Sequence, residues 1–460
     1  MRRCTDVARR QKRKTDPAPV PFGKTQGAEY RRRRRTLMRL MGDDAIAVIP
    51  AARVAYRNRD SEYAYRPDSD FHYLSGFDEP DALLVLVPGR KAGEYLVFCR
   101  ERDPEKETWH GRRLGVERAP AALGADDAFP IGDVDDILPG LLEGRREVYH
   151  TLGKDPLFDA QLLGWLNRAR ASRRRATGGD PEVFVSLDYH LHEMRLHKSR
   201  VELATLRRAA RISAAGHRRA MRAARPGMRE YELEAELVAE YVRQGATHAF
   251  LPIVGGGANG CILHYTENRD ELRDGDLVLI DSGAEHEKYA GDISRTFPVN
   301  GRFSEAQREV YDIVLAAQLA AIEAVRPNAH WNAPHEAAVK VLTRGLRDLG
   351  ILKGRLDTLL RDEAHKPYYM HRTGHWLGMD VHDVGEYKID EEWRVLEPGM
   401  VLTVEPGLYL GASRKVPKRY RDIGIRIEDD VVVTADGCEI ITADVPKVPE
   451  EVEALMAEGR

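Results

Sequence analysis

Short apolar runs separated by turns and charged segments dominate the first part of the chain. They include DAIAVIP (44–50), ALLVLVPG (82–89), EYLVFC (94–99) and REVYHTLG (146–153). Apolar runs of this length between turn residues predict strands, and the charged segments between them are typical of surface helices. This alternation predicts a smaller, mixed α/β N-terminal domain over residues 29–195.

A helix is expected where this domain begins. The segment EYRRRRRTLMRLM, which starts at Glu29, places Tyr30, Leu37, Met38 and Met41 near one face. We expect its arginines to form the exposed side, where their aliphatic stems help the packing.

From residue 196 onward, amphipathic segments and strand-like runs come in blocks. Helices are predicted at 198–224, 228–245, 304–325 and 333–350, with Ser199 and Ser304 as N-caps. Strands are predicted at 276–283, 290–299, 400–409 and 423–434. Because the elements are grouped and do not alternate strictly, the pattern predicts an α+β fold with an antiparallel sheet over residues 196–457.

Composition agrees with a globular protein of two domains. The chain has 460 residues, of which 42% are apolar and 32% charged, and a single core rarely grows to that length. No apolar run approaches the roughly 18 residues that a membrane-spanning helix needs. The four cysteines are widely separated and include no CxxC pair, which is typical of reduced thiols in a cytoplasmic protein.

Net charge is −3 overall but is unevenly distributed. Residues 1–35 contain 13 Lys or Arg and 3 Asp or Glu, a local balance of +10, so the remainder carries −13. Residues 1–28 are basic, interrupted by proline and poor in large apolar side chains, which predicts a disordered tail. This tail lacks the interleaved aromatic residues of a nucleic-acid-binding segment, so we do not expect it to bind nucleic acid.

Acidic residues interrupt the strand-like runs of the second part. The apolar run in LVLIDSG ends on Asp281, and YAGDISRTF contains Asp292 within the next predicted strand. The strand predicted in VLTVEPG ends on Glu405, and GIRIEDD carries Glu428. A lone carboxylate in a core is costly unless a positive group holds it. Antiparallel strands can aim Asp281 and Asp292 at one point, where a divalent cation would relieve their repulsion.

Histidines that could share this site lie in HRTGHWLGMDVHD, which contains His371, His375 and His382. His371 and His375 have the spacing of a helical zinc pair. Gly374 and Gly378 disfavour a helix, so strand and loop are predicted here.

A glycine-rich motif, GGGANG (255–260), fits the pattern G-x-G-x-x-G. A dinucleotide site needs a helix that opens within this motif. The following CILHYTEN predicts a strand and a turn, so nucleotide binding is not expected.

Five motifs, in this order, resemble the pita-bread metallopeptidase family, which includes aminopeptidase P, prolidase, methionine aminopeptidase and creatinase. They are HYTEN, LIDSGAEHEKYAGDISRTFPV, HWLGMDVHDVG, VLTVEPGLY and GIRIEDD. The similarity to the aminopeptidase P branch also includes DSEYAYRPDSDFHYLSGFDEPDALLVL and WHGRRLG, and it covers about residues 29–457. The resemblance implies a pseudo-symmetric pita-bread catalytic domain, a curved antiparallel sheet flanked by two helix pairs.

The resemblance also implies roles for single residues. The metal ligands of the family correspond to Asp281, Asp292, His375, Glu405 and Glu428. Asp292 and Glu428 match the ligands that bridge two ions.

Other positions match the family's substrate site. Glu405, His382, His264 and His371 correspond to catalytic positions, and His264, His382, Trp109 and Arg426 to substrate-site positions. Arg426 would support Asp281. Trp109, in WHGRRLG, would help to wall the pocket across a subunit contact, and an ordinary packed indole is the alternative.

The implied activity is release of the N-terminal residue from peptides with proline in second position, by attack of a metal-bridging hydroxide on the Xaa-Pro bond. An oxygen-rich donor set with one imidazole suits Mn²⁺, so two divalent ions, Mn²⁺, are expected as cofactors. A cytoplasmic homo-oligomer, a dimer or tetramer, is implied as well. Prolidase, which cleaves only dipeptides, and a non-catalytic binding protein on the same scaffold are the alternatives.

One position departs from the family pattern. Bacterial relatives place a tyrosine hydroxyl against the first aspartate, and Phe250 stands at that position here. Phenylalanine cannot donate a hydrogen bond. Either another donor serves Asp281, or the local alignment is shifted.

Overall fold

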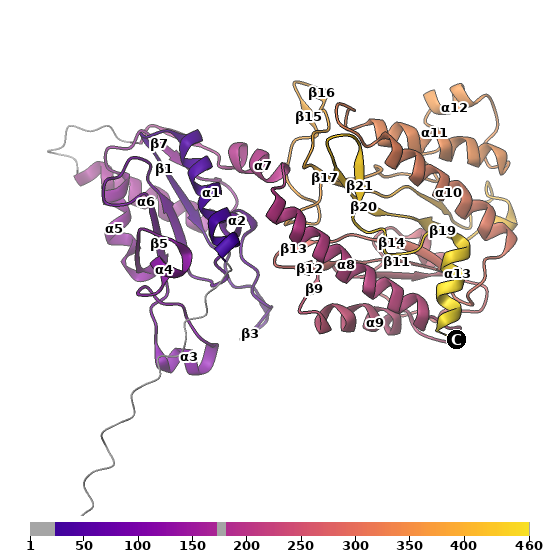
Figure 1. Cartoon of the computed structure of the whole chain (residues 1–460), viewed down its shortest axis with the longest axis horizontal. Helices are drawn as coiled ribbons and strands as arrows, with labels where there is room; N and C mark the ends of the chain where they lie inside the picture. Colours follow the sequence, from indigo (N-terminus) through magenta and orange to yellow (C-terminus); the bar gives the residue numbers. More distant parts are fainter. Residues whose placement is uncertain (1–23, 173–180, 460) are drawn as a thin grey trace, which may run out of the picture. The chain divides into compact units, whose positions relative to one another are not determined.

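The computed structural model describes residues 24–172 and 181–459, and the chain divides into two compact units, residues 1–191 and 192–460 (Figure 1). Most of the predicted tail, residues 1–23, lies outside the described residues. The last five residues assigned to that tail, 24–28, belong to the first helix instead, α1 (Lys24–Met41).

Unit 1 is built on a six-stranded mixed sheet with the order β6-β5-β4-β1-β7-β8. Its strands are β1 (Ala45–Pro50), β4 (Leu83–Leu86), β5 (Tyr95–Cys99), β6 (Asp127–Pro130), β7 (Glu147–Tyr149) and β8 (Val183–Val185). Strand β4 runs antiparallel to β1 and β5, whereas β7 is parallel to β1 and β8. A hairpin of β2 (Tyr56–Asn58) and β3 (Ser61–Glu62) lies outside this sheet.

Helices lie around this sheet, except α3 (Pro104–His110), which lies apart from it, below the other elements of unit 1 in Figure 1. Besides α1, the helices around the sheet are α2 (Ser69–Ser75), α4 (Ala119–Leu123), α5 (Val134–Leu142) and α6 (Pro156–Ser172). Helix α7 (Asp188–Leu196) runs across the division between the units. The predicted mixed α/β architecture of the N-terminal part is therefore confirmed.

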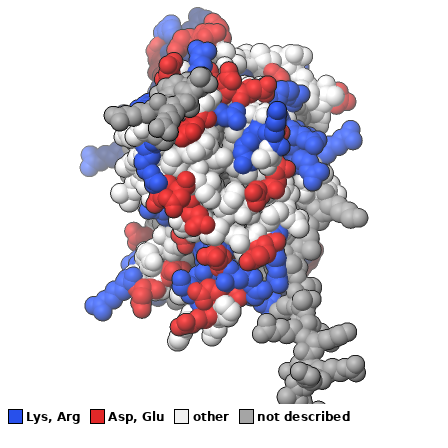
Figure 2. Space-filling model, turned by 90° about the vertical axis from the view of Figure 1, so that its left-hand side faces the viewer, with Lys and Arg blue, Asp and Glu red and all other residues white. Residues whose placement is uncertain are grey.

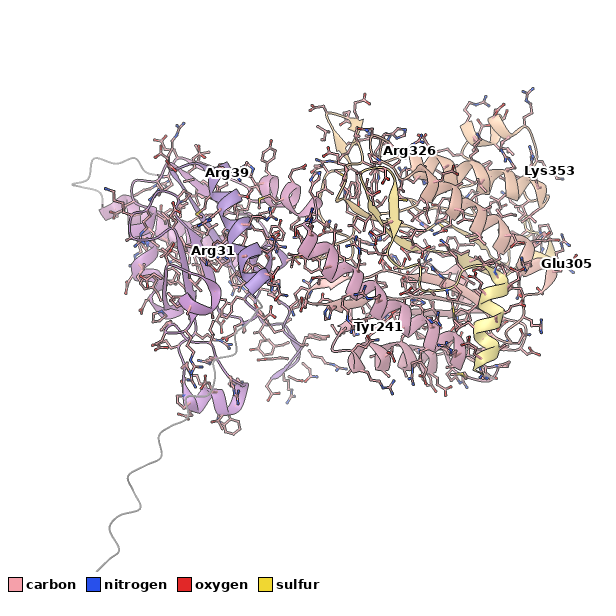
Figure 3. All side chains as sticks on the ribbon, in the orientation of Figure 1. Arg31, Arg39, Tyr241, Glu305, Arg326 and Lys353 are labelled. Carbon is pink, nitrogen blue, oxygen red and sulfur yellow. The ribbon has the colours of Figure 1, made fainter. Side chains whose placement is uncertain are left out.

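The sequence predicts that the arginines of α1 form its exposed side, but not all of them do. Arg31 and Arg39 are exposed (Figure 3), but Arg33 and Arg34 are each only 3% exposed. Arg33 donates to the carbonyl of Tyr73 at 3.0 Å and lies 4.0 Å from the centroid of its ring. Arg34 donates to the carbonyl of Leu74 at 2.7 Å. The buried guanidinium groups satisfy carbonyls at the end of α2, which the pattern along α1 could not reveal.

Unit 2 contains antiparallel strand pairs flanked by two helix pairs, as expected (Figure 1). The helices are α8 (Arg200–Ala223), α9 (Glu230–Arg243), α10 (Glu305–Ala324), α11 (Ala333–Asp348), α12 (Leu356–Arg361) and α13 (Pro449–Glu458). Ser199 and Ser304 cap α8 and α10 with complete capping boxes, which confirms both predicted helix starts.

The strands of unit 2 form several small sheets, with orders that include β10-β11-β14, β17-β20-β21 and β18-β19. The strands are β9 (Thr247–His248), β10 (Ile253–Gly256), β11 (Leu277–Asp281), β12 (Ala284–His286), β13 (Tyr289–Ala290), β14 (Ser294–Pro298), β15 (Lys388–Ile389), β16 (Glu392–Trp393), β17 (Val401–Val404), β18 (Gly407–Leu410), β19 (Ile423–Arg426), β20 (Asp429–Val433) and β21 (Cys438–Ile440). The strand predicted at CILHYTEN is not formed: the structure describes residues 262–269, and they form turns and irregular segments.

Strand β11 separates two apolar clusters. Leu277 and Leu279 pack with α10 and α11, whereas Val278 and Ile280 pack with α8, α9 and α13. Because alternate residues of a strand face opposite sides, Asp281 lies on the same side as Leu277 and Leu279. Both faces of this part of the sheet are thus covered by helices.

The acidic residues lie at strand ends or just outside them, which corrects the prediction for Asp292 and Glu428, both of which were expected within strands. Asp281 is the last residue of β11, and Asp292 lies two residues before β14. Glu405 directly follows β17, and Glu428 lies between β19 and β20. At a strand end a side chain can reach a cavity, whereas a carboxylate within a packed strand would face apolar neighbours.

A buried ionic network joins β14 to β20 and to the chain before α13. Asp429 accepts hydrogen bonds from Arg295 at 2.7 Å, from Lys447 at 2.6 Å and from Gln318 at 2.7 Å. Although burial favours the neutral acid, Arg295 and Lys447 hold the pKa of Asp429 below its ordinary value.

The described residues differ from those of a protein with a membrane-spanning helix and, on the face shown in Figure 2, from those of a strongly charged binding surface. None of their helices is both long and apolar enough to cross a lipid bilayer. Where described residues cover the face shown in Figure 2, basic and acidic side chains are interspersed, without a broad area of one sign.

Replacing Asp429 by alanine should lower the free energy of unfolding by about 3–5 kcal/mol, because Arg295 would remain buried without its carboxylate partner. Urea denaturation followed by circular dichroism measures this change. Asp436→Ala, at an exposed position, is the control and should shift stability by less than about 0.5 kcal/mol. Equal effects of the two substitutions would contradict the role assigned to the network.

Candidate metal centre

A cavity of about 770 Å³ in unit 2 brings most of the predicted site residues together. Its lining includes Asp281, Asp292, His375, Glu405, Glu428, His264, His371, His382, Arg426 and Phe250. The aromatic side chains of Trp331, Tyr387 and Trp393 line it as well. The cavity therefore combines a cluster of acids and imidazoles with an aromatic wall.

The backbone fixes three of the four carboxylates. Asp281 pairs with Ser294 in the ladder between β11 and β14. The amide of Glu428 donates to the carbonyl of Ser294 at 3.0 Å, and that of Glu405 donates to the carbonyl of Thr373 at 2.8 Å. Residues far apart in the sequence thus converge because their strands share hydrogen bonds.

His375 reaches the carboxylates from an irregular segment that lies against β17. Its carbonyl accepts from the amide of Thr403 at 3.0 Å. A Cβ at Gly374 would lie 2.0 Å from the carbonyl oxygen of Thr403, so only glycine allows this approach. The interpretation of His371 and His375 as outside a helix is confirmed.

The imidazole of His375 is oriented by its own neighbour. Its Nδ1 lies 3.0 Å from the carbonyl oxygen of Trp376, which makes Nδ1 the donor and leaves the lone pair on Nε2. Nε2 lies 3.4 Å from Oδ2 of Asp292 and 3.7 Å from Oε1 of Glu405. Ligand atoms of Asp292, His375 and Glu428 all lie within 4.8 Å of one another.

Arg426 ties the acid cluster to the surrounding structure. Its Nη2 donates to Oδ2 of Asp281 at 2.6 Å, and its Nη1 donates to the hydroxyl of Tyr409 at 2.9 Å. Its Nε donates to Oγ of Ser294 at 2.8 Å, and that hydroxyl donates to Oε2 of Glu428 at 2.7 Å. Arg426 is therefore the donor for Asp281, a role that Phe250 cannot perform.

The electrostatics of the cluster are unfavourable without a cation. Burial, followed by repulsion from Asp281, raises the pKa of Asp292 well above its ordinary value. Burial and repulsion from Asp292 do the same for Glu428, and burial raises the pKa of Glu405. Oδ1 of Asp281 and Oδ1 of Asp292 are buried without a hydrogen-bond partner among the described residues. This set of oxygens and one imidazole has the chemistry that holds divalent cations.

The remaining histidines border the same cavity. Nε2 of His371 lies 2.8 Å from the hydroxyl of Tyr409, and its Nδ1 lies 3.7 Å from Oε2 of Glu405. Burial lowers the pKa of His371 to about 3, so its imidazole is neutral at ordinary pH. The ring of His382 meets that of His375 edge-on, with centroids 4.3 Å apart, and His264 also lines the cavity.

Trp109 is not among the residues that line this cavity. It lies on α3 in unit 1 and is 80% exposed. The alternative of a packed indole is therefore wrong for this chain taken alone. A contact with a second subunit stays a prediction.

Sequence reasoning missed the polar residues that support the acids. Ser294, Tyr409 and Asp430 connect to the cluster through hydrogen bonds. All three lie within the quoted motifs, but only Asp430 stands out by its chemistry, as the third acid of the IEDD run. The aromatic wall was missed too, because its members lie in segments that the site motifs do not include.

Comparison with known proteins agrees with this geometry. Residues 204–435 match metallopeptidase family M24, and residues 30–149 match the N-terminal domain of aminopeptidase P. The chain is 49% identical over 435 residues to Xaa-Pro aminopeptidase of Escherichia coli, covering 94% of this chain and 98% of that protein.

Solved structures are similar over 94% of this chain. Pseudomonas aeruginosa aminopeptidase PepP superposes with a TM-score of 0.93 at 55% identity, covering 94% of this chain and 98% of that one. Zinc-substituted E. coli aminopeptidase P in complex with product gives a TM-score of 0.92 at 48% identity, covering 94% and 99%. With an acid cluster of this kind at the centre of the matched region, the chain belongs to metallopeptidase family M24.

Proposed function

We propose that this protein is an Xaa-Pro aminopeptidase, which releases the N-terminal residue from peptides with proline in second position. The observation that carries the proposal is the convergence of four carboxylates and one imidazole on a cavity with an aromatic wall. The names of the similar proteins from E. coli and P. aeruginosa support the same activity.

Asp281, Asp292, His375, Glu405 and Glu428 would hold two divalent ions, for which we propose Mn²⁺. Oδ1 of Asp281 and Oδ1 of Asp292, which are buried without a hydrogen-bond partner in the described part of the chain, support this assignment because a cation would satisfy both. When bound, such ions supply a water activated for attack and a Lewis acid that polarises the scissile carbonyl.

Glu405 is the proposed acid/base. Burial raises the pKa of its carboxyl, which helps it to accept a proton and to deliver it to the proline nitrogen of the leaving group. Oε2 of Glu405 lies 3.7 Å from Nδ1 of His371, and Oε1 lies 3.7 Å from Nε2 of His375, so both oxygens face imidazoles. His382 and His264 are placed to bind the substrate carbonyl and to shuttle protons.

The aromatic wall supports a preference for proline. The ring centroids of Trp331 and Tyr387 lie 4.7 Å apart. The Arg372 guanidinium lies over the ring of Trp393, 5.1 Å from its centroid. A pyrrolidine ring packs well against such faces. The Xaa-Pro amide has no N–H, so a site without an acceptor for that hydrogen does not penalise proline.

We also propose that the protein is a cytoplasmic homo-oligomer. The 80% exposed Trp109 supports a homo-oligomer in which this side chain meets a second subunit. The scattered cysteines support a reducing, cytoplasmic location.

Replacing Glu405 by glutamine should lower kcat/KM for an Xaa-Pro-Yaa tripeptide by about 10²–10⁴-fold, because an amide can neither accept nor deliver the proton. Initial rates with Mn²⁺-loaded protein measure this effect. Glu391→Gln changes an exposed glutamate outside the cavity lining and should leave the rate unchanged. A Glu405→Gln variant as active as this control would rule out the acid/base role.

Removal of metal should abolish hydrolysis, because the carboxylates alone provide no activated water. Protein stripped with a chelator is assayed with Xaa-Pro and Xaa-Pro-Yaa peptides before and after addition of Mn²⁺, Co²⁺ or Zn²⁺. We expect Mn²⁺ to restore cleavage of the tripeptides. Restored cleavage of the dipeptides alone would identify a prolidase, and full activity in protein free of metal would refute the metal mechanism.

A further inference from the structure

Asp292 differs from the other carboxylates of the cluster in how its backbone is held. It lies in the irregular segment 291–293, between β13 and β14. Its amide donates to a side chain, Oδ2 of Asp430, at 3.0 Å. Asp281 is held by a strand ladder, and the amides of Glu405 and Glu428 donate to backbone carbonyls.

Asp430 is itself rigidly placed. It is 0% exposed and lies on β20, where it pairs with Thr403 of β17. Its amide donates to Oγ1 of Thr442 at 3.0 Å, and that hydroxyl donates to Oδ1 of Asp429 at 2.8 Å. The acceptor for the Asp292 amide is therefore fixed by the same ionic network that joins β14 to β20.

The cost of this arrangement argues against a purely structural role. Oδ1 of Asp430 has no hydrogen-bond partner among the described residues, and neither carboxylate oxygen forms an ion pair with a described cation. A buried carboxyl group with one unsatisfied oxygen destabilises a fold, and an apolar side chain of similar size often does not. Asp430 is therefore costly for stability and useful for the position of Asp292.

We propose that Asp430 is a positioning residue that fixes the backbone of Asp292 and thereby sets the affinity of the cluster for divalent metal. The inference rests on the proposed function, because it takes Asp292 to be a ligand. Groups that orient ligands from behind typically contribute about 10–100-fold to metal affinity. No other described group anchors the Asp292 amide.

The test is calorimetric titration of Mn²⁺ into metal-stripped, full-length protein. Asp430→Leu removes the acceptor and should weaken Mn²⁺ binding by about 10–100-fold. Asp430→Asn keeps an acceptor oxygen and should stay within about threefold of the unchanged protein. Thr343→Val, at another fully buried polar position whose hydroxyl has no partner among the described residues, is the matched control and should not alter binding.

Thermal unfolding of the metal-free variants separates positioning from a structural role. Without metal, we expect Asp430→Leu to unfold at a temperature close to that of the unchanged protein. When Mn²⁺ is added, its unfolding temperature should rise by less than that of the unchanged protein. Unchanged Mn²⁺ affinity in Asp430→Leu would overturn the inference, and so would an Asn variant as weak as the Leu variant. Failure of the unchanged protein to bind Mn²⁺ would instead refute the Mn²⁺ site of the proposed function.

Discussion

Four carboxylates converge in one cavity of unit 2, and Arg426 bonds directly to only one of them, Asp281. Acids removed from water repel strongly because little solvent lies between them to weaken the field. Burial and this repulsion raise the pKa of Asp292 and of Glu428. A divalent cation would resolve the conflict, since it would keep the acids ionised and be held by them. The charge imbalance that would otherwise destabilise the fold is thus the source of its proposed chemistry.

Two arginines organise this site from different sides, and Ser294 joins them. Its hydroxyl accepts from Arg426 and donates to Glu428, while its carbonyl accepts from Arg295 at 3.0 Å. Arg295 also bonds to Asp429. The acids are therefore held by a continuous polar network. A substitution at one end of this network can move a carboxylate at the other end, even where the substituted residue does not contact substrate.

The lining of the cavity has a polar part, which we call the floor, and an aromatic part, the wall. The floor consists of groups whose protonation and charge are set by burial, such as Glu405 and the neutral His371. The wall consists of Trp331, Tyr387 and Trp393, which contribute shape and no ionisable charge near neutral pH. On the proposed function, substitutions in the wall would alter the selection of proline, and substitutions in the charged cluster would alter cleavage.

The hydrophobic pattern determined the two-part organisation, the capped helices that begin after Ser199 and Ser304, and the strands that end near Asp281 and Glu405. These features are local, because caps and alternation depend on residues a few positions apart. The five motifs identified the family, but only the tertiary structure decided that Arg33 is buried and that Asp430, 138 residues away, anchors Asp292. Such contacts depend on the pairing of distant strands and helices, and no periodicity within a single segment encodes which carbonyl or amide a buried charge will meet.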